Sequence, residues 1–148
     1  MNHNGAIPTI LITGDSLSSE HYTSLVALLG MPKGQDSPSS FRAMHGGIRA
    51  LACNGTFQLA HNRRNRLEKL GQDLNNQKPT IVVFNRGAHY ANDTILEQDM
   101  RRNIADLNKW QKGWCVQTGT PCRLFFRTTT TGHPNCSQFK EPVNDAVL

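Results

Sequence analysis

The chain has 148 residues, of which 37% are hydrophobic and 18% are charged, and its formal net charge is +5. This composition excludes a disordered chain, and no apolar stretch is long enough to span a membrane. We expect one domain with a sizeable core, a monomer, and no cofactor. The four cysteines lack a Cys-x-x-Cys pair, which argues against zinc; a disulfide between Cys115 and Cys122 and four reduced thiols both remain open.

A strand is predicted near the start of the chain, where the apolar run Ile10-Leu11-Ile12 leads into Gly14-Asp15-Ser16-Leu17. A helix follows, with Ser18 or Ser19 as its cap and Gly30 at its end. The apolar face of this helix consists of Tyr22, Leu25, Val26 and Leu29.

The middle of the chain predicts two strands separated by a helix. A short apolar run over residues 48–52 indicates a strand that ends at Gly55. Leucines recur at helical spacing within residues 67–74, which predicts an amphipathic helix. The continuous β-branched and aromatic run over residues 80–84 predicts a strand buried on both faces, and Asn85 follows it.

The last elements are a long helix and a further strand. Thr94-Ile95-Leu96-Glu97 has the form of a capping box at a helix start. The apolar stripe of this helix consists of Leu96, Met100, Ile104 and Leu107. Residues 124–126 predict a strand that leads into a loop carrying His133.

Strands that alternate with helices predict an α/β fold, a three-layer α/β/α sandwich around a mainly parallel sheet. Right-handed crossovers bring the carboxyl ends of the strands to one edge of the sheet, where ligands bind. Ser16, Gly55, Asn85 and His133 each follow a predicted strand. We therefore expect these four residues to lie near one another.

Those residues suit ester cleavage by a serine nucleophile, which needs an oxyanion hole and a base. Ser16 is the candidate nucleophile. Its own N–H, the N–H of Gly55 and the amide of Asn85 are candidate oxyanion donors. The alternative is that Gly14-Asp15-Ser16-Leu17 is a plain turn with a helix cap, and that Gly55 and Asn85 are ordinary turn residues.

Three blocks of the sequence resemble the SGNH (GDSL-type) hydrolases, and within them the PC-esterase branch that includes plant polysaccharide O-acetyltransferases. Gly14-Asp15-Ser16-Leu17 looks like the first block of the family. The run Ile-Val-Val-Phe-Asn-Arg-Gly-Ala-His-Tyr at residues 81–90 is similar to a later block of the branch. Residues 125–136, with Arg127-Thr128-Thr129 and His133, resemble its Arg-Thr-rich loop. Residues 53–57 match the second block more weakly.

The resemblance implies a flavodoxin-like SGNH fold that hydrolyses or transfers an acyl group on an acylated carbohydrate or a small ester. It implies that His89, Tyr90 and Arg127 line the substrate pocket. It also implies the secretory pathway, Golgi or extracellular, although a cytoplasmic location stays open.

The family takes its catalytic base from an Asp-x-x-His block beyond the Arg-Thr loop, and the sequence reaches Leu148 without one. We therefore expect the domain to be incomplete at its C-terminus. His133 is either a substitute base or a loop histidine. An inactive glycan-binding remnant is the alternative function.

A basic nucleic-acid-binding module is the third possibility, because Arg63, Arg64, Arg66 and Lys69 form a cluster. The outer faces of amphipathic helices are normally charged, and no aromatic residues interleave with this cluster. These features make nucleic acid an improbable partner. The scattered histidines lack metal-ligand spacing, so we expect no metal.

Overall fold

The structure, a computed structural model, describes residues 7–30, 47–64, 66–86 and 92–128. Five strands form one sheet in the order β2-β3-β1-β4-β5. The parallel strands are β1 (Thr9–Gly14), β3 (Phe57–Arg63), β4 (Ile81–Arg86) and β5 (Arg123–Thr128). The edge strand β2 (Gly47–Ala52) is antiparallel to β3. The predicted α/β class with a mainly parallel sheet is confirmed.

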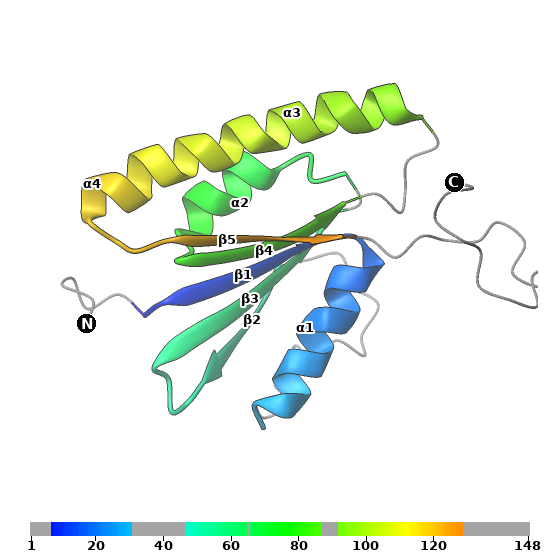
Figure 1. The fold of residues 1–148 in the computed structure, drawn as a ribbon. Coiled ribbons are helices and arrows are strands. Elements are labelled where there is room, and N and C mark those ends of the chain that lie inside the picture. Colours follow the sequence, from blue (N-terminus) through cyan, green and yellow to red (C-terminus); the bar gives the residue numbers. More distant parts are fainter. Residues whose placement is uncertain (1–6, 31–46, 65, 87–91, 129–148) are drawn as a thin grey trace, which may run out of the picture.

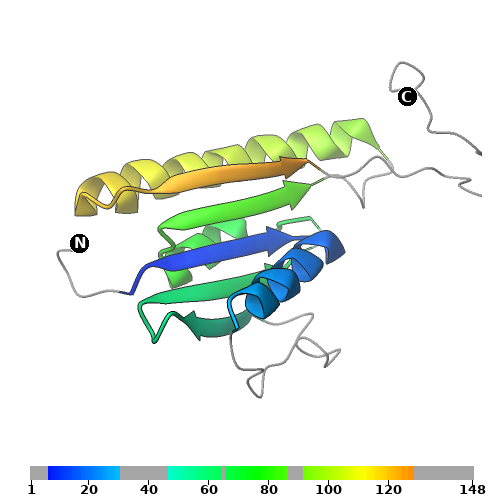
Figure 2. The ribbon, with the colours of Figure 1, turned by 60° about the horizontal axis from the view of Figure 1, so that its bottom comes forward.

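Helices cover both faces of the sheet. Figure 1 shows α1 (Ser16–Leu28) on one face, and α2 (Leu70–Gln77) and α3 (Asp93–Trp110) on the other. The long helix α3 continues through the π-helical turn η1 (Gln111–Cys115) into α4 (Val116–Thr118). The arrowheads of β1, β4 and β5 point the same way in Figure 2, and α1 starts beside the end of β1. The sheet and its helices therefore make the three layers that the sequence predicts.

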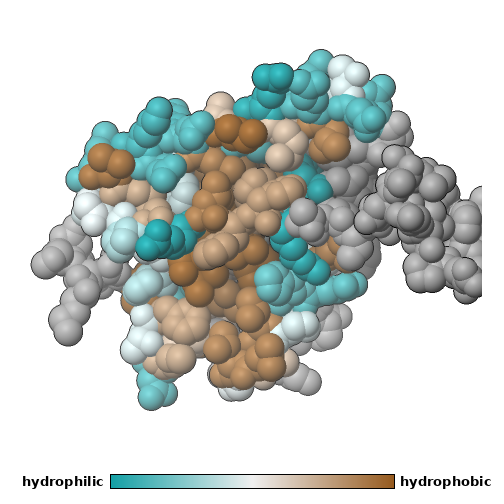
Figure 3. Space-filling model, in the orientation of Figure 1, coloured by the Kyte–Doolittle hydropathy of each residue, from teal (hydrophilic) through white to brown (hydrophobic). Residues whose placement is uncertain are grey.

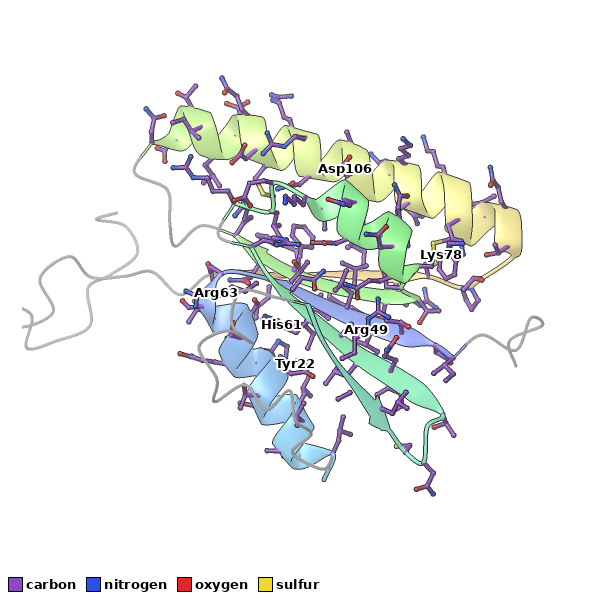
Figure 4. The ribbon with its side chains drawn as sticks, turned by 180° about the vertical axis from the view of Figure 1, so that it is seen from behind. Tyr22, Arg49, His61, Arg63, Lys78 and Asp106 are labelled. Atoms are coloured by element: carbon purple, nitrogen blue, oxygen red, sulfur yellow. A yellow bond between two sulfur atoms is a disulfide. The ribbon has the colours of Figure 1, made fainter. Side chains whose placement is uncertain are left out.

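The core is divided by the sheet into two clusters. The larger cluster lies between the sheet and the helices α2 and α3. Full burial of each leucine in it stabilises the fold by about 2 kcal/mol. The cluster includes Leu11, Leu67, Leu70, Leu74, Val82, Phe84, Leu107 and Trp110. The smaller cluster, Ile12, Tyr22, Ala52 and Leu59, lies under α1. Across the larger layer, the carboxylate of Asp106 in α3 accepts the Gly71 N–H of α2 at 3.2 Å. Figure 4 labels Asp106 in this position.

The start of α1 differs from the prediction. Asp15, not Ser18 or Ser19, is the cap, because its Oδ1 accepts the N–H of Leu17 at 3.0 Å. The Ser18 hydroxyl instead donates to the Asp15 carbonyl oxygen at 2.7 Å. An earlier cap puts Ser16 inside the helix, at its first position.

The start and the buried side of α3 also differ from the prediction. Asn92 is its cap, since its Oδ1 accepts from the N–H of Thr94 at 2.8 Å. The buried side of α3 includes Asp99 and Asn103, whereas Ile104 is 49% exposed. Which residues of α3 are buried therefore depends more on where α2 and β4 lie beneath the helix than on where its hydrophobic stripe runs.

Among the residues that the structure describes, Cys115 and Cys122 form a disulfide. It connects the end of η1 to the segment before β5. Of the two possibilities that the sequence leaves open for this pair, a disulfide or two reduced thiols, the structure has the disulfide. Cys53 is free and exposed, and Cys136 lies outside the described residues. None of the described helices has the length and apolarity needed to cross a membrane.

The face of the sheet beside α1 is covered unevenly. α1 packs mainly on β1 and β3. On this face of the edge strand β5, Phe125 is 54% exposed, and it pairs with Val83 of β4. Leu124 and Phe126, which are 46% and 50% exposed, point to the opposite face of the sheet. Figure 3 shows hydrophobic side chains at the surface between α1 and α3. No described helix covers this side of β5.

Candidate functional site at the carboxyl edge of the sheet

One row of residues crosses the sheet at the carboxyl end of β1. Strand register pairs Gly14 with Arg63 on β3, and Asn85 with Arg127 on β5. Gly14 lies directly against Asn85 of β4. Ser16 follows two residues after Gly14, at the beginning of α1. Residues from all four parallel strands therefore meet around the start of this helix.

A buried hydrogen bond holds the residue before Ser16 in place. The amide Nδ2 of Asn85 donates to Oδ1 of Asp15 at 2.8 Å, and these residues are 2% and 1% exposed. The same carboxylate oxygen accepts the Leu17 N–H. Asp15 thus closes the first turn of α1 and also joins it to β4. The structure brings Ser16 and Asn85 together, as the sequence predicts.

Gly14 permits this close approach of two strands. Its φ is +148°, a value that L side chains rarely adopt. A Cβ at Gly14 would overlap the side-chain oxygen of Asn85 and lie 2.9 Å from the backbone oxygen of that residue. Glycine is therefore required where the chain turns from β1 into α1.

Ser16 is half-buried and is the first residue of α1. Its N–H has no partner within the helix, because the first N–H groups of any helix are left unpaired. The positive end of the helix dipole adds to the attraction of that N–H for an anion. Within the described residues, nothing hydrogen-bonds to the Ser16 hydroxyl. The hydroxyl and the N–H beside it suit a nucleophile and an oxyanion donor.

Gly55 does not reach Ser16. It lies in the turn between β2 and β3, and Gln58, three residues later, pairs with Thr9 at the amino end of β1. The prediction that the Gly55 N–H belongs to the oxyanion hole is therefore wrong. The physical reason is that β2 is antiparallel, so its carboxyl end points to the opposite edge of the sheet.

His61 is the described histidine that packs against the first turns of α1, but its partner is not Ser16. Its Nε2 lies 3.2 Å from the hydroxyl of Ser18 and 3.4 Å from that of Ser19. Its ring lies 5.2 Å from the Tyr22 ring, and Figure 4 shows both beneath α1. Burial, followed by the nearby charge of Arg63, lowers the pKa of His61 to about 4. His61 is therefore neutral at pH 7 and supports α1 from below.

The depressed pKa of His61 predicts an acid-sensitive fold. Above pH 6.5 the histidine is neutral in both states, and between pH 6.5 and about 4 only the unfolded state binds a proton. Stability should therefore fall by about 3 kcal/mol across this window as the pH is lowered. Urea unfolding at several pH values measures the loss. The His61→Gln protein should lose less stability than the wild type as the pH falls from 6.5 to about 4, whereas His21→Gln should lose as much as the wild type. An equal dependence of stability on pH in the wild type and in His61→Gln would contradict the expectation.

Arg127 is the predicted substrate-binding residue that the structure describes. It is exposed, and its Nη1 donates to the carbonyl oxygen of Leu17 at 3.1 Å. Burial and the charge of Arg127 together lower the pKa of His21, which lies one turn further along α1. The guanidinium is thus fixed against the residue that follows Ser16. His133, His89 and Tyr90, the other predicted site residues, lie outside the described residues.

Sequence reasoning missed β3 and, with it, Arg63 and His61 at this edge. Phe57 and Leu59 alternate as a strand requires, but the last two buried positions of the strand, His61 and Asn62, are polar. A central strand next to a helix start can bury polar groups that have local partners, and hydrophobicity alone does not reveal such a strand. Among the described residues, no cluster of three or more histidine, cysteine or acidic side chains is placed to hold a metal.

No protein-family model, no curated protein and no solved structure matches this chain.

Proposed function

We propose that this chain is an SGNH-type carboxylic-ester hydrolase or O-acetyltransferase that acts on acylated carbohydrate through Ser16. The observation that carries the proposal is the position of Ser16. Ser16 begins α1 at the carboxyl end of the central strand β1, next to the hydrogen bond between Asp15 and Asn85. Ligands of open α/β sheets bind at this edge.

In the proposed reaction, the Ser16 hydroxyl attacks the carbonyl carbon of the acyl ester while a base takes its proton. The tetrahedral oxyanion accepts hydrogen bonds from the Ser16 N–H and from the second amide N–H of Asn85, whose first N–H is bound to Asp15. The sugar oxygen leaves with a proton, and an acyl-enzyme forms. Water then completes hydrolysis, or another sugar hydroxyl completes transfer. The base assigned in this proposal is His133.

The disulfide between Cys115 and Cys122 agrees with the secretory pathway as the proposed location, since disulfides persist in oxidising compartments.

An inactive glycan-binding remnant is the second candidate. The observation that favours it is the commitment of His61 to Ser18 and Ser19, which leaves no described histidine hydrogen-bonded to Ser16. Loss of one member of a catalytic triad removes several powers of ten in rate. Glycan binding without any turnover by the wild-type protein would select this candidate.

Covalent labelling with a fluorophosphonate tests the main proposal. We expect an adduct on Ser16, located by mass spectrometry of the digested protein, because the probe phosphonylates activated serines with loss of fluoride. Ser16→Ala should lose the label. Ser19→Ala, a change of the same type in the same helix turn, should keep it. An adduct confined to other residues, or no adduct on the wild-type protein, would overturn the proposed mechanism.

A further inference from the structure

Two arginines stand on either side of the proposed active site. Arg63 of β3 and Arg127 of β5 belong to the row that contains Gly14 and Asn85. Three strand spacings separate their Cα atoms, or about 14 Å. Figure 4 shows Arg63 beside the first turn of α1. Ser16 therefore lies between two arginines, one on β3 and one on β5.

Arg127 differs from neighbouring arginines in how its charge is compensated. Arg64 forms an ion pair with Asp73 at 3.1 Å, and Arg86 lies 3.7 Å from Asp99. No carboxylate of the described residues forms an ion pair with Arg127. One of its five N–H groups is bound to Leu17 oxygen, and the side chain is exposed. Within the described residues, no other hydrogen bond occupies the remaining donors of Arg127.

The negative charge nearest to Ser16 in the sequence is that of Asp15, and it is not exposed to a ligand. The first turn of α1 contains no acidic residue, and the Asp15 carboxylate is buried and bound to Asn85 and Leu17. The amino end of α1 adds partial positive charge at the same place. A neutral substrate gains little from this potential, whereas an anionic one is attracted by it.

We propose that Arg127 binds a carboxylate or sulfate group of the glycan, so that the acylated carbohydrate recognised beside Ser16 is acidic rather than neutral. The identity of the ligand as a glycan rests on the proposed function. The planar guanidinium matches two oxygens of such an anion. Its bond to the Leu17 carbonyl restrains it in advance, which lowers the entropy lost on binding.

Calorimetric titration of the full chain carrying Ser16→Ala tests this inference without turnover. The probes are an oligouronide, a sulfated oligosaccharide, a neutral oligosaccharide of equal length, and a single-stranded oligonucleotide. We expect at least one charged glycan to bind about tenfold or more tightly than the neutral one, since a hydrogen bond to a charged group has this magnitude. The carboxylate and sulfate probes distinguish the two sources of charge.

Substitutions on β5 supply the matched comparison. Arg127→Gln should abolish the preference for the charged glycan, and Arg127→Lys should keep part of it. Arg123→Gln removes an equal charge from the same strand and the same face, but at its other end, beside Ile81. It should change affinity by less than about twofold. Circular dichroism confirms that each variant is folded.

Three results would overturn the inference: equal affinity for charged and neutral glycans, equal losses in Arg123→Gln and Arg127→Gln, or tighter binding of the oligonucleotide than of either charged glycan. The experiments distinguish failure of this inference from failure of the proposed function. A protein that is labelled at Ser16 but lacks charge selectivity keeps the esterase proposal. Arg127-dependent binding of charged glycan without labelling keeps the anion site.

Discussion

Replacing Ser16 with alanine is expected to lower kcat/KM for a small acetyl ester by at least about a thousandfold, because the attacking atom is removed. A small ester is the right substrate, since it reports on the serine without contributions from glycan contacts at Arg127. The fold should be unaffected. No described residue hydrogen-bonds to the Ser16 hydroxyl, and alanine is a good helix former at the start of α1.

The control for this substitution is Ser19→Ala, which removes a hydroxyl near His61 at a half-buried position of the same helix. It should retain ester hydrolysis within a few-fold of wild type. Equal unfolding midpoints in urea would show that neither change acts through stability. Wild-type rates in the Ser16→Ala protein would exclude Ser16 as the nucleophile. Absence of hydrolysis in every protein, together with retained glycan binding, would select the inactive remnant.

Replacing Gly14 with alanine should destabilise the protein by about 4 kcal/mol, a large share of the stability of a typical domain. Part of this cost comes from the positive φ of +148°. The rest comes from the clash of the new Cβ with Asn85. This clash would force β4 away from β1 and lengthen the hydrogen bond between Asn85 and Asp15. Urea unfolding followed by circular dichroism measures the change.

Gly119→Ala separates the two contributions. Gly119 also has a positive φ, +64°, but a Cβ there meets nothing within 4 Å. It should therefore cost only about 1 kcal/mol, the conformational penalty alone. A Gly14→Ala protein too unstable to isolate agrees with the expectation when Gly119→Ala is obtained folded. Equal midpoints for the two variants would show that contact with Asn85 is not limiting.

The parts of the fold that the sequence predicts well are those with a strong local signal. The apolar runs of β1 and β4 mark strands that pack from both faces. Asn85, predicted to follow the second of these strands directly, is the penultimate residue of β4. Ser16, predicted to follow the first strand, begins α1 directly after β1. The helix caps were less predictable. The caps are Asp15 and Asn92, and serine and threonine residues close to each of them also suit a cap.

The sequence by itself determined that Ser16 stands at the carboxyl end of a strand, because a glycine turn between an apolar run and a helix is specified locally. Only the tertiary structure decided which residues join it. Strand direction and order depend on contacts between distant segments, so Gly55 lies at the opposite edge while Arg63 comes into the row. The bond from Arg127 to Leu17 joins residues 110 positions apart. No local pattern encodes such a contact, because it forms only when β5 packs beside β4.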